Sequence, residues 1–110
     1  MENHELVAPL IDKLDKDFSL EKTDTDLVAT EPNDIQAVKQ ILVERIIEMM
    51  DRNYERFMTT LYRIDLDEAK VNFIISNAKI PEIPELLADM IIERQLQRIR
   101  TQIMYKQGKL

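Results

Sequence analysis

Residues 35–64 read IQAVKQILVERIIEMMDRNYERFMTTLYRI, and this stretch decides the expected fold. Its apolar residues recur every three or four positions, which places them together on one face of an α-helix. The stretch contains no glycine and no proline, the two residues that most often end a helix. The pattern therefore predicts one long amphipathic helix over residues 35–64.

The length of this helix raises a question about the shape of the protein. A continuous helix over residues 35–64 would be about 45 Å long, whereas a compact domain of this size has a diameter of about 34 Å. We therefore expect the helix to be kinked, the protein to be elongated, or a partner to cover the excess. Asn53 lies within the apolar face, and two interpretations fit it: it fixes the register of a helix pair, or it caps a kink or meets water at an edge.

Other helices are expected on both sides of this stretch. Apolar spacing predicts an N-terminal amphipathic helix over residues 5–18, a short helix over 67–78 that Asp65 or Asp67 can cap, and a last helix over 84–107. The predicted fold class is all-α. It is an antiparallel hairpin of two long helices, 35–64 and 84–107, with a short connecting helix and the N-terminal amphipathic helix.

The N-terminal third differs in composition from the rest of the chain. Residues 19–33 are rich in threonine, aspartate and proline, with few apolar side chains to bury, which is typical of a linker. We therefore predict two parts: an N-terminal helix with an acidic linker over residues 1–33, and a helical domain over residues 34–110.

The composition excludes several classes of active site. One glycine in 110 residues leaves no phosphate-binding glycine loop or dinucleotide fingerprint. Without cysteine there is neither a disulfide nor a thiolate metal site, and a single histidine, at position 4, leaves no histidine pair for a metal. We expect no enzyme activity, no cofactor and no catalytic or metal-binding residue.

The start of the chain and its apolar runs bear on location. Residues 1–5 are acidic and polar, unlike the basic start of a signal peptide. The longest apolar runs are far shorter than the roughly 20 residues that a membrane span needs. We therefore expect a cytoplasmic protein that does not contact a membrane.

The charges are distributed unevenly. The net charge is −6, yet residues 94–110 hold five bases and no acid, whereas residues 1–34 hold ten acids and three bases. Basic residues of the last helix are the candidates for facing a polyanion, and they are Arg94, Arg98, Arg100 and Lys106. A nucleic-acid-associated regulator is therefore the alternative function, although the acidic balance of the whole chain disfavours phosphate contacts.

The wide apolar face of residues 35–64 favours a helical protein–protein interaction module that forms a homodimer. A second copy would cover part of this face and explain its length. The candidate interface residues share the face and are Leu42, Ile46, Met49, Met50, Asn53 and Phe57.

Three short segments carry a resemblance: residues 61–65 (LYRID), 91–95 (IIERQ) and 105–106 (YK). Together they resemble a group of short uncharacterised all-helical bacterial proteins, and the similarity would cover residues 35–107. The resemblance implies one helical unit with a connecting turn at Asp65. It implies no activity and no site.

Overall fold

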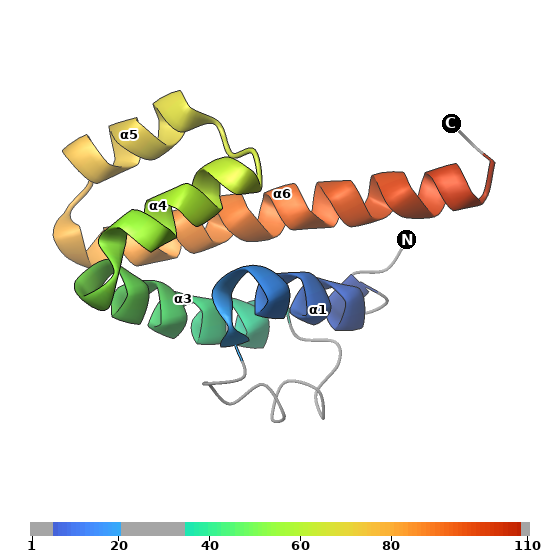
Figure 1. Ribbon diagram of the computed structural model, residues 1–110, viewed down its shortest axis with the longest axis horizontal. Coiled ribbons are helices and arrows are strands. Elements are labelled where there is room, and N and C mark those ends of the chain that lie inside the picture. Colours follow the sequence, from blue (N-terminus) through green and yellow to red (C-terminus); the bar gives the residue numbers. More distant parts are fainter. Residues whose placement is uncertain (1–5, 21–34, 109–110) are drawn as a thin grey trace.

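The computed structural model describes residues 6–20 and 35–108 of the chain. Within these residues the structure is helical and contains no strand (Figure 1). The elements in chain order are α1 (Val7–Phe18), α3 (Ile35–Arg52), α4 (Tyr54–Arg63), α5 (Glu68–Asn77), the 3₁₀ helix η3 (Ile80–Glu82) and α6 (Ile83–Lys106). The all-α prediction is confirmed.

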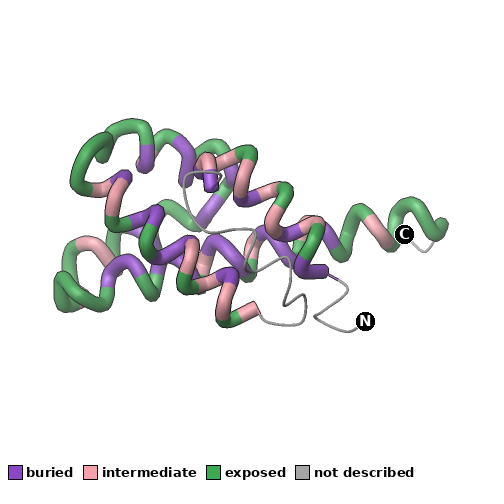
Figure 2. The backbone as a smooth tube through the Cα atoms, turned by 90° about the horizontal axis from the view of Figure 1, so that it is seen from below, coloured by how far each residue is buried: buried purple, intermediate pink, exposed green. Residues whose placement is uncertain are grey.

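Helix α6 is the longest element, and α1, α3, α5 and η3 pack against it, whereas α4 packs mainly against α3 (Figure 1). The most extensive packing of α6 is with α3, which runs in the opposite direction, and α1 packs against both α3 and α6. Helix α5 packs against the N-terminal half of α6. The C-terminal end of α6 extends past its neighbours, and its surface there is largely exposed (Figure 2).

The five α-helices share one apolar core. Phe18 of α1 and Phe57 of α4 meet inside it, with ring centroids 6.4 Å apart. Val7, Leu10, Leu14 and Phe18 of α1 are buried in the same apolar core as residues of α3, α4, α5 and α6. The predicted acidic linker, 19–33, lies outside the described residues from residue 21 onward.

The stretch 35–64 is two helices, so the prediction of one continuous helix is wrong. Helix α3 ends at Arg52 and α4 begins at Tyr54. Between them Asn53 leaves the helical conformation, and its side-chain oxygen accepts a hydrogen bond from the backbone N–H of Arg56 at 3.3 Å. Of the two roles expected for Asn53, the structure has the cap at a kink. The break also resolves the excess length of a continuous helix. The longer piece, α3, has 18 residues and is about 27 Å long, which is less than the 40 Å long axis of the molecule.

The chain turns sharply after α4. Asp65 has a φ of 65°, and the backbone N–H groups of Asp65 and Leu66 donate to the carbonyls of Tyr62 and Leu61. This pair of bonds is the Schellman arrangement that commonly ends a helix. The expected turn at Asp65 is therefore present, with aspartate rather than glycine in the left-handed conformation.

Asp67 caps α5, as its position in the sequence suggests. Its carboxylate accepts hydrogen bonds from the backbone N–H groups of Ala69 at 3.0 Å and Lys70 at 3.2 Å. We expect Asp67→Ala to lower the free energy of unfolding by about 1 kcal/mol. Asp67→Ser, which keeps a capping oxygen, should recover most of that loss in a urea titration. If the two variants are equally stable, the cap contributes nothing.

Candidate functional site

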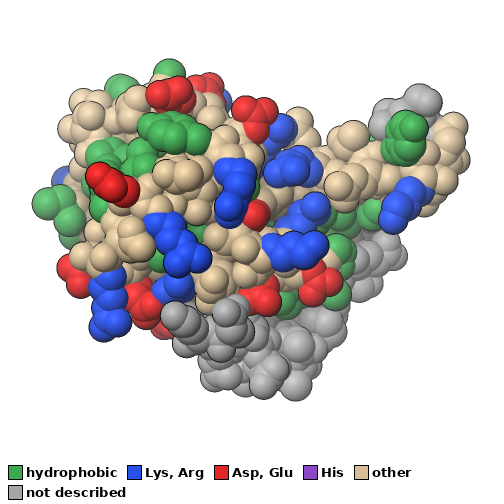
Figure 3. Space-filling view, in the orientation of Figure 1, with side chains coloured by type: hydrophobic (Ala, Val, Ile, Leu, Met, Phe, Trp, Pro, Cys, Tyr) green, Lys and Arg blue, Asp and Glu red, His purple; other side chains and the backbone are tan. Residues whose placement is uncertain are grey.

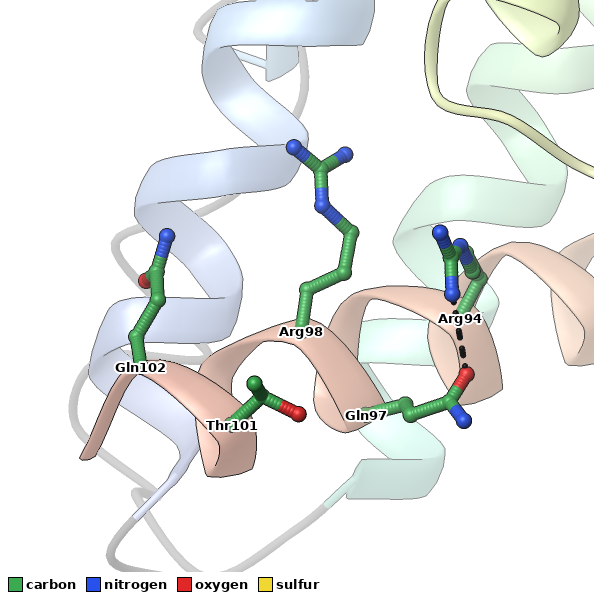
Figure 4. A pocket seen from close by; sticks show the side chains of 5 residues that line it. All are labelled: Arg94, Gln97, Arg98, Thr101 and Gln102. Carbon is green, nitrogen blue, oxygen red and sulfur yellow. Dashed lines mark hydrogen bonds between the residues drawn. The ribbon is translucent and has the colours of Figure 1, made fainter. Parts of the chain in front are cut away.

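The predicted polyanion-facing residues lie along the second half of α6. Arg94 and Arg98 are one helical turn apart, and with Gln97, Thr101 and Gln102 they line a hollow of about 300 Å³ (Figure 4). Arg94 donates to Gln97 at 3.1 Å and pairs with the Asp65 carboxylate at 3.3 Å. The guanidinium of Arg98 makes no hydrogen bond or ion pair within residues 6–20 and 35–108.

The structure brings together two of these four residues and separates the others. Arg100 follows Arg98 by two positions, which turns its side chain about 200° around the helix. Lys106 lies two turns further along, at the end of α6. The space-filling view shows basic side chains gathered over the middle of one face, beside the projecting end of α6 (Figure 3).

A polar network beneath this surface was not predicted. Gln95 is fully buried, and its side-chain amide donates to the Asp17 carboxylate at 2.7 Å. The same carboxylate lies 3.7 Å from the Arg63 guanidinium, so one acidic group links α1, α4 and α6. The sequence spacing could have indicated that Gln95 is buried. It lies three residues after Ile92 and four before Ile99, and so falls within the buried stripe of α6.

The candidate interface residues are mostly covered within a single chain. Leu42, Ile46 and Phe57 are fully buried, Met49 is nearly so, Met50 is half-buried and Asn53 is exposed. The kink at Asn53 lets α4 fold back over the core, and α1 and α6 cover the apolar face of α3. Of these six residues, only Met50 and Asn53 remain accessible to a second copy in this fold.

An apolar groove lies where α3 ends and α6 begins. It has a volume of about 530 Å³ and is lined by Ile47, Met50, Asp51, Ile80, Pro81, Ile83 and Pro84. Ile47 is 52% exposed and Ile80 is 82% exposed, which is unusual for isoleucine. Acidic residues lie in and next to the groove. Asp51 lines it, the exposed Glu82 lies between two lining residues in the sequence, and the exposed Glu85 directly follows the last one.

This groove was missed at the level of sequence for a physical reason. Ile47 and Met50 belong to the apolar face of residues 35–64, and periodicity alone does not tell which part of a face is covered. The connection before α6 is short, because the 3₁₀ helix η3 leads directly into α6, with Pro81 and Pro84 each in the first turn of its helix. The connection therefore lines the end of α3 without covering it.

Neither a metal-binding cluster nor a membrane-spanning helix is present among the described residues. Among residues 6–20 and 35–108, no group of three or more histidine, cysteine or acidic side chains could hold a metal ion. No helix in this part of the chain has both the length and the apolar character needed to cross a bilayer.

Comparisons with known proteins add no family to this picture. No protein family, curated protein or solved structure matches the chain. The resemblance to short bacterial proteins therefore stays a prediction.

Proposed function

We propose that the protein is a non-enzymatic helical protein–protein interaction module that forms a homodimer through the apolar groove. The groove is the observation that carries this proposal. Contiguous exposed apolar surface on a small protein commonly marks an interaction site, and here two isoleucines and a proline stand open to water. The groove residues of α3 and α6 are held in place by the extensive antiparallel packing of these two helices.

The occupant that fits the groove is the end of α6 from a second copy. Residues 100–106, here called the C-terminal arm, follow the last buried residue of α6, Ile99. The arm presents Met104 and Tyr105, the latter 76% exposed, together with the bases Arg100 and Lys106. Apolar and basic side chains of the arm thus match the apolar and acidic character of the groove.

Symmetry supports this pairing. The groove and the arm lie at opposite ends of α6, which is about 36 Å long (Figure 1). Two copies related by a two-fold axis, with their α6 helices antiparallel, would place each arm in the groove of the other copy. Both contacts would be satisfied at once, so the assembly would close as a dimer and leave no groove open.

Light scattering coupled to size exclusion tests the dimer. At micromolar concentration the natural chain should have twice the mass of one copy, whereas Ile80→Asp and Met104→Asp should each give the monomer mass. Phe73→Asp is the matched control, because Phe73 is also exposed, at 68%, but does not line the groove. A monomeric natural chain, or a Phe73→Asp variant that dissociates like the others, would contradict the proposal.

The alternative, a nucleic-acid-associated regulator, rests on one specific observation. Arg94 and Arg98 share a stripe beside a polar hollow, and the acidic excess of the chain is mostly elsewhere. Residues 6–20 and 35–108 hold 14 acids and 13 bases, so seven acids and two lysines fall in the remainder. The described surface is therefore close to neutral and can carry a basic stripe.

Paired charge substitutions test this alternative. If the stripe binds polyanions, Arg94→Gln with Arg98→Gln should weaken heparin binding about tenfold and reduce its salt dependence. Arg100→Gln with Lys106→Gln removes the same charge but should have a smaller effect, because these residues lie off the stripe. Fluorescence anisotropy at two salt concentrations measures both. Negligible binding by the natural chain would remove the alternative.

A further inference from the structure

A second hollow, on the opposite side of α3 from the apolar groove, has a different character. It has a volume of about 220 Å³ and lies at the break between α3 and α4. Its lining residues are Arg45, Glu48, Met49, Arg52, Asn53 and Arg56. Three arginines therefore line one small hollow, with Glu48 as the single acidic residue among the lining residues.

Arg45 is held firmly in place. It is only 7% exposed, its Nε donates to the carbonyl oxygen of Phe18 at 2.6 Å, and its Nη1 pairs with the Glu48 carboxylate. These contacts tie α1 to α3 and fix the direction of the guanidinium. Glu48 is engaged with Arg45, so it does not neutralise the other two arginines.

Arg52 and Arg56 are the open members of the group. Neither guanidinium makes a hydrogen bond or ion pair with any other residue of 6–20 or 35–108. They lie four positions apart, on either side of the break at Asn53, and both line the hollow with Arg45. The lining side chains therefore have two uncompensated positive charges, in a protein whose net charge is −6.

We propose that this hollow binds the phosphate group of a small phosphorylated compound. Arginine suits phosphate because its planar guanidinium offers parallel N–H donors to two oxygens at once. A phosphate dianion would match the two uncompensated charges of Arg52 and Arg56. Arg45 would lie at the buried end of the site. Because its guanidinium is already bonded to Phe18 and Glu48, it would attract the phosphate by its charge and would not be a main hydrogen-bond donor to it. The exposed side of the hollow leaves room for the rest of the compound.

Binding of phosphate in this hollow should stabilise the fold at the break between α3 and α4. A phosphate held by Arg52 and Arg56 would join the end of α3 to the first turn of α4, and so stabilise the break at Asn53. Since a ligand that binds only the folded state raises stability, the protein should melt at a higher temperature when phosphate is present.

Calorimetric titration and thermal melting with sodium phosphate and phenyl phosphate, at constant ionic strength against sodium chloride, test the proposal. Phenyl phosphate should bind the natural chain and raise its melting temperature. Arg52→Gln with Arg56→Gln should weaken that binding at least tenfold, while Lys70→Gln with Lys79→Gln, which removes the same charge elsewhere on the surface, should leave it unchanged. Both pairs are exposed, so circular dichroism should confirm that both variants fold.

The two probes also separate the sources of the phosphate. Stronger binding of phenyl phosphate than of inorganic phosphate supports a phosphorylated compound, whereas stronger binding of inorganic phosphate would overturn that part of the proposal. Equal weakening in the two double variants would show attraction by overall charge only. That result, or no binding of either probe at millimolar concentration, would overturn the site.

Discussion

A chain that begins at residue 21 should fail to fold. Within residues 6–20, α1 and its flanks bury Leu6, Val7, Leu10, Leu14, Phe18 and Leu20, each at most 1% exposed. Removing a buried side chain of this size costs about 1.5–3 kcal/mol, and the total stability of a small domain is only about 5–15 kcal/mol. The apolar surfaces of α3 and α6 that α1 covers would also face water.

Urea titration followed by circular dichroism measures the effect. The truncated chain should show no cooperative transition, and addition of a peptide of residues 1–20 should restore one. If the truncated chain alone unfolds cooperatively at the midpoint of the full chain, then residues 34–110 form an independent domain and the shared core described above is wrong.

Two neighbouring isoleucines should respond in opposite ways to the same substitution. Ile46 is fully buried, so Ile46→Asp would place an unpaired charge in the core and should lower the free energy of unfolding by at least about 4 kcal/mol. Ile47 is half-exposed and lines the groove, so Ile47→Asp should change stability by no more than about 0.5 kcal/mol. It should nevertheless produce a monomer.

The pair separates folding from assembly because each variant serves as the control for the other. Chemical unfolding measures stability, and light scattering measures mass. If Ile46→Asp remains folded and only dissociates, the residue lies in an interface rather than in the core. If Ile47→Asp unfolds, the groove is part of the folded core and is not a docking surface.

Much of the fold follows from local patterns in the sequence. Apolar spacing predicts helices close to those observed, and Asp67 and Pro84 lie at helix starts in the structure as in the sequence. The break at Asn53 was harder to place, because the surrounding stretch has good helix formers and neither glycine nor proline. The one indication of a break is the polar amide of Asn53 on an apolar face, and this amide fits either the register of a helix pair or a cap at a kink.

The surfaces could not be predicted in the same way. Periodicity identifies an apolar face but does not tell whether the same chain or a second copy covers it, so Leu42 and Phe57 were expected at an interface. Convergence of residues from different helices depends on the tertiary fold. The residues of the groove come together only after α3, η3 and α6 have packed. The three arginines at the break are different, because their spacing of seven and then four positions already places them on one face of a helix.

The central claim, that the C-terminal arm of one copy lies in the groove of another, has a direct test. The chain has no cysteine, so single variants can be joined by a short bismaleimide cross-linker. Within one chain the groove and Met104 are separated by about 30 Å of α6, so a short linker joins them only between copies. A mixture of Ile47→Cys and Met104→Cys chains should form a covalent dimer rapidly, whereas Phe73→Cys mixed with Met104→Cys should not. Cross-linking of the first mixture no faster than the second would contradict the claim.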